Sequence, residues 1–359
     1  MKFNKLFVLA AAAAFCVTAC GTSTSTSSTA SSGAASDTAS EAAESSSTDD
    51  DQAAASDFKV ALIIGTGGLG DGGFNDSLYN GVQSAAEELG ITYQLVEPSE
   101  VSEFEGDYMD LSASGEYDLI IGGGFDQTEA LANVAGEFPD QKYVFVDGEL
   151  DGLDNVTSIL FKDQEKTYMV GIVAAMNTQT GKVGMVVGMD TPSQNTFVAG
   201  FMAGAKSVNP DVEVEVKYVG SFSDTTTAKE LALAEYEDGV DIVYAVAGGS
   251  GLGVFNAAEQ ENFYAIGVDV NQCVIDPDHI MLSSLRNNGK VVYDSIVEAM
   301  EGTLTGGAVY PGLAEEAVDV TNEGSNVELV EGTLEAVEAA KQQIISGEVV
   351  VPTTIEDVQ

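Results

Sequence analysis

The chain has 359 residues, with 58 acidic against 13 basic side chains and a formal charge of -45 at pH 7. Such an excess of negative charge repels polyanions, so we expect no nucleic-acid partner. Because the chain contains a single histidine, we also expect no metal site and no histidine-dependent catalytic triad.

The first twenty residues read as an export signal. A basic "MKFNK" precedes the apolar run "LFVLAAAAAFCV", which is too short to span a bilayer, and the small residues "VTAC" follow. Small residues that end on a cysteine resemble a bacterial lipobox. We therefore predict a lipoprotein signal peptide over residues 1–19 and lipidation of Cys20; an ordinary secretory signal with a chance cysteine is the alternative.

Residues 20–57 are, after Cys20, mostly serine, threonine, alanine and glycine with a rising acidic content. Such a segment has too little apolar surface to fold, so we expect a disordered tether. Residues 58–359 would then be a soluble domain held at the extracytoplasmic face of the cell membrane by the lipid. Within this domain Cys273 is the only cysteine, which excludes an intrachain disulfide and indicates a small buried hydrophobic residue.

Beyond the tether, short apolar runs alternate with segments of helical period. We predict a first series of strands at 59–64, 92–96, 117–123, 142–148 and 156–161, with helices at 75–89, 126–137 and 164–177. A second series has strands at 182–188, 212–220, 241–249 and 264–270, with helices near 193–207, 225–237 and 252–262. Continuous apolar strands separated by helices are typical of parallel sheets covered on both faces. The fold class is therefore α/β, with two doubly wound lobes.

The last part of the chain suggests that the two lobes exchange segments. A strand at 280–285 and a helix at 289–301 precede a β-like "AEEAVDV" and a final helix near 331–346. We predict that lobe 1 contains about 58–179 plus 286–312, and lobe 2 about 180–285 plus 313–359. Several crossings would form a multi-strand hinge, with a ligand cleft between the carboxyl ends of the facing strands.

The glycine loop "GTGGLG" at residues 65–70 has the spacing of a dinucleotide fingerprint. The following helix is expected at about Asn75, too far from the last glycine to hold a pyrophosphate. A second glycine loop, "AGGSGLG", follows a strand of the other lobe and contains Gly248 and Gly249. We infer that both loops bring bare backbone to a ligand between the lobes. Asn75 or Asp76 is the expected N-cap of the helix.

Four aspartates follow predicted strands: Asp126, Asp147, Asp190 and Asp269. Each could be a helix cap or a turn residue. Because parallel strands end at the same edge of a sheet, their carboxylates together indicate a shared cleft. A carboxylate accepts hydrogen bonds from two hydroxyl groups, which suits the diol of a ribose or a hexose.

Seven blocks of sequence follow one another over about residues 58–300 in the same order as the blocks of a known family. Among them are "DGGFNDSLYNGVQSAAEELGI", "AGGSGLGVFNAA" and "YAIGVDVNQ". They resemble the basic membrane protein (BMP) family, solute-binding lipoproteins of ABC importers that include the purine nucleoside receptors. The resemblance implies a type I periplasmic-binding-protein fold with a nucleoside between the lobes. It also implies no cofactor and no catalytic residue.

The resemblance further implies roles for polar residues. Asp71 and Asn75 match the Asp and Asn of the family's first block, although Gly73 replaces its usual serine. Asp126 matches an acidic residue that could read the edge of the base. Asp269 matches the aspartate expected at the ribose hydroxyls.

A basic residue and three aromatic residues complete the implied site. Arg286 stands where the family has a lysine, with Lys290 as the alternative if the register slips. Arginine keeps the charge of a lysine but changes its hydrogen-bond geometry. Phe74, and Phe125 or Phe197 with it, are the candidates to sandwich the base.

The leading hypothesis is a monomeric receptor that captures a nucleoside and delivers it to an ABC permease in the membrane. The same fold could instead bind a sugar or a flavin-like solute. A secreted hydrolase or oxidoreductase is a third hypothesis, but the chain has no G-x-S-x-G motif and no Cys/His arrangement. An adhesion or structural lipoprotein would leave the cleft empty.

Overall fold

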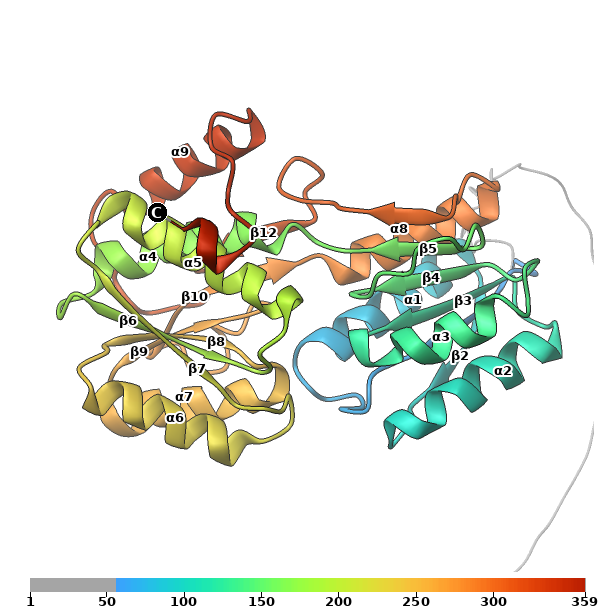
Figure 1. Cartoon of the computed structure of the whole chain (residues 1–359), viewed down its shortest axis with the longest axis horizontal. Coiled ribbons are helices and arrows are strands. Elements are labelled where there is room, and N and C mark those ends of the chain that lie inside the picture. Colours follow the sequence, from blue (N-terminus) through green and yellow to red (C-terminus); the bar gives the residue numbers. More distant parts are fainter. Residues whose placement is uncertain (1–55, 359) are drawn as a thin grey trace, which may run out of the picture. The chain divides into compact units, whose positions relative to one another are not determined.

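The computed structural model describes residues 56–358, which belong to one compact unit. The predicted signal peptide, Cys20 and nearly all of the tether lie outside the described residues. Two six-stranded sheets form the framework of this unit (Figure 1). None of the helices between residues 56 and 358 combines the length and the apolar character needed to cross a membrane.

The first sheet is entirely parallel, with the strand order β11-β5-β4-β3-β1-β2. Its strands are β1 Lys59–Ile63, β2 Thr92–Val96, β3 Leu119–Gly123, β4 Tyr143–Val146, β5 Val156–Ile159 and β11 Gly307–Val309. All residues of β3, β4 and β5 are buried. Such uninterrupted burial requires helices on both faces of the sheet.

The second sheet has the strand order β12-β10-β9-β8-β6-β7. Its strands are β6 Lys182–Val187, β7 Glu213–Tyr218, β8 Ile242–Val246, β9 Tyr264–Gly267, β10 Ile280–Arg286 and β12 Val318–Thr321. All pairs are parallel except β10 with β12, which is antiparallel. The predicted α/β class with two doubly wound sheets is confirmed.

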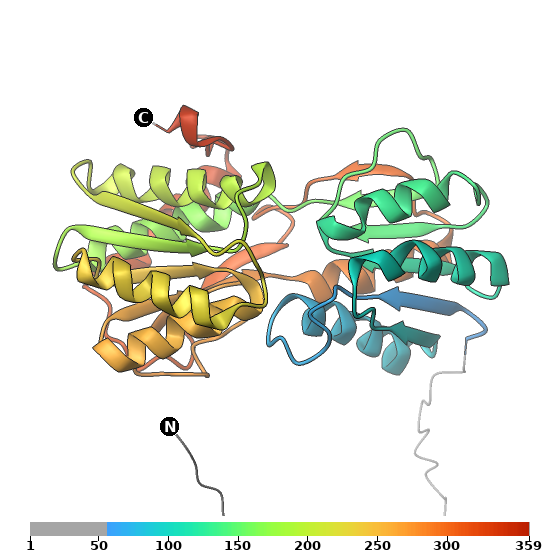
Figure 2. The same cartoon turned by 60° about the horizontal axis from the view of Figure 1, so that its bottom comes forward.

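Helices cover both faces of each sheet (Figure 2). On the first sheet, α1 Phe74–Leu89 packs beside α8 Asn288–Glu301 on one face, and α2 Phe104–Ser114 beside α3 Thr128–Ala135 on the other. On the second sheet, α6 Thr225–Glu237 and α7 Leu252–Glu261 share one face. The opposite face carries α4 Asp163–Asn177, α5 Pro192–Val208 and α9 Thr333–Ile345.

The chain passes between the sheets after β5, after β10 and after β11. Helix α4 packs on α5 and α9 and therefore belongs with the second sheet. The first crossing thus lies at residues 160–162, not at residue 179 as the sequence suggested. Ten of the fifteen residues of α4 are buried, so the helix has no clearly polar face that would indicate which sheet it covers.

Two elements were missed by the sequence analysis. Helix α2 carries several acidic residues, and its buried large apolar side chains are Phe104, Tyr108 and Leu111. Strand β11 is three residues long and pairs only at the edge of the first sheet, with β5. Both elements depend on tertiary contacts more than on local pattern.

Candidate ligand-binding cleft

A cleft of about 360 Å³ lies between the carboxyl ends of the strands of the two sheets. Its size is within the range of pockets that enclose small ligands. All ten ligand-binding candidates of the sequence analysis line it: Asp71, Phe74, Asn75, Phe125, Asp126, Phe197, Gly248, Gly249, Asp269 and Arg286. The structure therefore brings these residues together, whereas their contacts with a ligand stay a prediction.

The first glycine loop is held in shape by side chains at the start of α1. The Asn75 amide accepts a hydrogen bond from the Gly65 N–H at 3.0 Å and donates one to the Gly68 carbonyl at 3.0 Å. Asp71 accepts from the backbone N–H groups of Gly73 and Asn75, each at 2.9 Å. The expectation that Asn75 or Asp76 caps α1 is therefore wrong. The Asp71 carboxylate accepts hydrogen bonds from backbone N–H groups at the start of α1, and the helix begins at Phe74, one residue before Asn75.

Aromatic rings line the cleft from both lobes. Phe125, which follows β3, meets Phe222, which follows β7, edge to face with ring centroids 6.0 Å apart. Phe74 packs against Gly123, where a Cβ would come within 3.2 Å of its ring. Phe222 was not predicted from the sequence, although its position after a strand of the second lobe was a usable signal.

Phe197 has a different environment from the other rings. It is 2% exposed, and the Arg286 guanidinium and the Lys166 ammonium lie 5.2 and 5.0 Å from its ring centroid. Its π-face is thus engaged in cation–π contacts within the protein. Of the candidate stacking rings, Phe74, Phe125 and the newly identified Phe222 are the more accessible ones.

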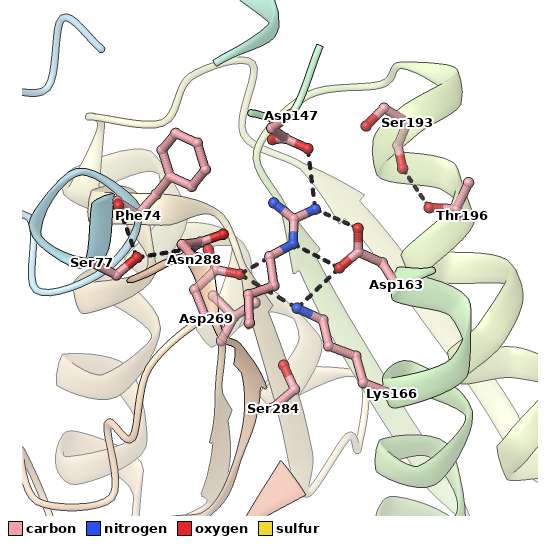
Figure 3. Close-up of polar contacts among 12 residues, drawn as sticks. Phe74, Ser77, Asp147, Asp163, Lys166, Ser193, Thr196, Asp269, Ser284 and Asn288 are labelled. Carbon is pink, nitrogen blue, oxygen red and sulfur yellow. Dashed lines mark hydrogen bonds and ion pairs between the residues drawn. The ribbon is translucent and has the colours of Figure 1, made fainter. Parts of the chain in front are cut away.

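A buried network of charges forms one wall of the cleft (Figure 3). Arg286 contacts Asp163 through two nitrogens, one at 2.7 Å, and lies 3.2 Å from Asp147 and 3.8 Å from Asp269. Lys166 lies between Asp163, at 3.1 Å, and Asp269, at 3.4 Å. Three carboxylates thus share two cations. Asp163 and Lys166 were not predicted from the sequence.

Burial and pairing shift the proton affinities of this network in different directions. Burial raises the pKa of Asp147, and the nearby Arg286 only partly opposes this. Burial also acts on Asp163, but the charges of Arg286 and Lys166 prevail and lower its pKa. Burial lowers the pKa of Lys166. The pKa of Arg286 is raised despite burial by the surrounding carboxylates. The guanidinium therefore stays charged and orients the carboxylates around it.

The backbone aims two of these carboxylates. Asp147 follows β4 with a φ of 64°, and Asp269 follows β9 with a φ of 66°. Left-handed backbone at a residue other than glycine costs on the order of 1–3 kcal/mol, and such residues cluster at functional sites. The two residues end corresponding strands of the two sheets, and both point a carboxylate at Arg286.

Two other residues do not join the cleft. Asp190 accepts a hydrogen bond from the Asn195 amide at 3.0 Å and does not line the cavity. Lys290 pairs with Asp294 on the exposed side of α8. Three of the four aspartates thus line the same cleft, as predicted. Of the two basic candidates, Arg286 lines the cleft and Lys290 does not.

Asp126 is available to a ligand. It lines the cavity, and no ion pair engages it among residues 56–358. Burial raises its pKa, and the negative charge of Asp147 adds to the effect. Within the same residues, no cluster of His, Cys, Asp and Glu could hold a metal ion. The site therefore offers carboxylates, an amide and rings for binding an organic solute.

The family model of the PnrA-like ABC transporter substrate-binding proteins matches residues 58–354. The chain belongs to this family. The resemblance seen in the sequence is thereby confirmed, because the family model covers most of the chain, as do several relatives. One of them, the "ABC transporter nucleoside-binding protein BmpA" of Lactococcus lactis, is 33% identical and covers 83% of this chain and 90% of its own length.

A second relative and a solved structure support the same family and fold. An uncharacterized lipoprotein of Pyrococcus abyssi is 33% identical over 74% of this chain and 69% of its own. The crystal structure of an ABC transporter solute-binding protein from Aeropyrum pernix superposes with a TM-score of 0.76 at 33% identity, covering 82% of this chain and 94% of that one. The chain is thus a substrate-binding protein of an ABC transporter.

Proposed function

We propose that the cleft binds a nucleoside, most suitably a purine nucleoside, and that the protein delivers it to an ABC permease. One observation carries the proposal: aromatic rings and a preorganised group of carboxylates line the same cleft. A nucleoside presents a planar base and a ribose diol, which match these two kinds of group. The Lactococcus relative, which is named a nucleoside-binding protein, supports the proposal.

The rings and Asp126 serve the base in this proposal. Phe74, Phe125 and Phe222 reach the cleft from both lobes, so a base that inserts between them would be stacked when the lobes close. Stacking on an aromatic side chain contributes about 1–3 kcal/mol per base. The Asp126 carboxylate accepts hydrogen bonds from N–H groups on the edge of the base.

Asp269 serves the ribose. Its side chain is 15% exposed, and Lys166 and Arg286 already orient its carboxylate. Little side-chain entropy is therefore lost at Asp269 when the ligand binds. It accepts hydrogen bonds from two adjacent hydroxyl groups. The backbone at Gly248, which has a φ of 53°, and at Gly249 completes the wall of the cleft.

A thermal-shift screen tests the proposal. We expect purine nucleosides at one hundred times their Kd to stabilise the protein by about 2.7 kcal/mol. Phe222→Ala should weaken this binding by about 5- to 150-fold, because it removes one stacking ring, whereas Phe222→Tyr should retain most of it. Binding of pentoses, hexoses or flavins in place of nucleosides would contradict the proposed ligand and leave the family unchanged. Hydrolysis of the nucleoside to free base would contradict the receptor role.

We also propose that Cys20 carries the lipid and that the receptor is a monomer at the extracytoplasmic face of the membrane. The lipobox-like "VTAC" and the lipoprotein relative of Pyrococcus abyssi support the anchor. We expect Cys20→Ala to move the protein from the membrane fraction into the soluble fraction, because acyl chains provide the membrane affinity. Fractionation followed by immunoblotting measures this. An unchanged membrane fraction would contradict lipidation at this residue.

A further inference from the structure

Gln194 is the unexplained polar residue of the cleft. It lies in the first turn of α5, is 8% exposed and lines the cavity. Its backbone N–H donates to the Thr191 hydroxyl at 3.3 Å. Its side-chain Oε1, however, is buried and accepts no hydrogen bond from any residue between 56 and 358. Buried acceptors are normally paired, so an unpaired one that borders a ligand cavity calls for a partner.

The neighbouring residues do not share this property. The Asn195 amide donates to Asp190 and accepts from the Tyr218 hydroxyl at 2.6 Å. The Thr196 hydroxyl donates to the Ser193 carbonyl at 2.7 Å, as Figure 3 shows. The start of α5 is therefore hydrogen-bonded within the protein on its other sides. Gln194, which lines the cavity, is thus the residue of this turn whose amide oxygen has no partner among residues 56–358.

Gln194 also lies beside the charged wall of the cleft. Residues three apart in a helix share a face, so Gln194 is next to Phe197, whose ring lies 5.2 Å from the Arg286 guanidinium. Arg286 in turn contacts Asp269. Gln194 is thus placed near the groups assigned to the ribose. An amide that offers both an acceptor and a donor matches a hydroxyl group, which needs both.

We infer that Gln194 is a specificity-determining residue whose amide oxygen accepts a hydrogen bond from a sugar hydroxyl of the bound solute. The inference rests on the proposed function and extends it, because it adds a ribose contact that the sequence analysis did not identify. It implies that this receptor discriminates ribonucleosides from analogues that lack one particular hydroxyl. A site built to bond a hydroxyl binds the analogue without it more weakly, because the buried polar group is left unpaired.

Calorimetric titration of Gln194→Met tests the inference, since methionine keeps the length of the side chain and removes the amide. The titrants are inosine, its 2′-, 3′- and 5′-deoxy analogues, and hypoxanthine. We expect the variant to bind inosine about 10-fold or more weakly than the wild type. One deoxy analogue, the one without the contacted hydroxyl, should bind both proteins equally.

Four results would contradict the inference. Equal inosine affinity of variant and wild type would exclude a contact, and equal losses for all analogues and for hypoxanthine would assign Gln194 to the base. A lower melting temperature of the ligand-free variant would indicate a structural role, whereas removal of an unpaired acceptor should not destabilise the protein. If the wild type binds no nucleoside, the proposed function fails as well; if the wild type binds and the variant is unaffected, only the present inference fails.

Discussion

Replacing Arg286 by methionine should lower the free energy of unfolding by about 3–5 kcal/mol at pH 7, because it leaves buried carboxylates without their main partner. Asp147, Asp163 and Asp269 all contact the guanidinium, and of the cations between residues 56 and 358 only Lys166 would remain paired with the latter two. The loss should shrink as the pH falls, since the pKa of Asp147 is already raised and this carboxyl can take up a proton. Urea unfolding followed by circular dichroism measures the difference.

Two further variants make this prediction specific. Arg286→Lys keeps the charge but loses the two-nitrogen contact with Asp163, so its loss should be smaller. Lys290→Met removes a lysine from an exposed pair with Asp294, which should cost no more than about 1 kcal/mol. Equal stabilities of Arg286→Met and Lys290→Met would contradict the account of the buried network.

A second large effect should come from Glu235, which lies between α6 and the second sheet. Its side chain is fully buried, and neither carboxylate oxygen has a hydrogen-bond partner among the described residues. Gly184 of β6 provides the space, since a Cβ there would lie 2.5 Å from Oε2. Lys217, the cation whose charge opposes the effect of burial on Glu235, is itself paired with Glu215 at 2.7 Å and with Asp238 at 3.6 Å. Burial, aided by the charge of Glu215, raises the pKa of Glu235 to about 8.

The protein should therefore lose stability as the pH rises through the neutral range. Between the ordinary glutamate pKa of 4.5 and the folded value of about 8, the folded state holds a proton that the unfolded chain has released. Each pH unit in this interval thus favours unfolding by about 1.4 kcal/mol, or at most about 5 kcal/mol in all. Below pH 4.5 both states are protonated and this contribution vanishes.

Glu235→Gln isolates the effect, because glutamine has the same shape and does not ionise. We expect its stability relative to the wild type to rise steadily from pH 4.5 to pH 8.5 and then to level off. Urea unfolding of both proteins at several pH values measures the difference. Glu230→Gln, at an exposed position of the same helix, serves as the control and should follow the wild type. Parallel curves for Glu235→Gln and the wild type would mean that Glu235 ionises normally in the folded protein.

Most of the framework could be predicted from the sequence, because strands buried on both faces produce long apolar runs that few other structures require. The errors occurred where local pattern is weak. Helix α4 is buried on nearly all sides between other helices, so its sequence does not indicate which sheet it covers. Helix α2 has an acidic surface and only a few apolar anchors, among them Phe104 and Tyr108.

The cleft could be predicted to the extent that its residues follow strands. Asp126, Asp147 and Asp269 were found in this way, because parallel strands place their carboxyl ends together. Lys166 and Gln194 lie inside helices, where no comparable rule applies. A fully buried lysine is rare, and its position one turn into α4 gives no sign that it contacts Asp269. Such partners become visible only when the helices are packed onto their sheet.

The central claim is that the cleft binds a nucleoside through both its rings and Asp269. Isothermal titration calorimetry of the purified protein with adenosine, guanosine and inosine tests this claim most directly, with Asp269→Asn titrated in parallel. The account predicts binding of one purine nucleoside per chain, weakened by about 10-fold or more in the variant because a charged acceptor for the diol is lost. No heat from any nucleoside, together with binding of a sugar or a flavin, would contradict it.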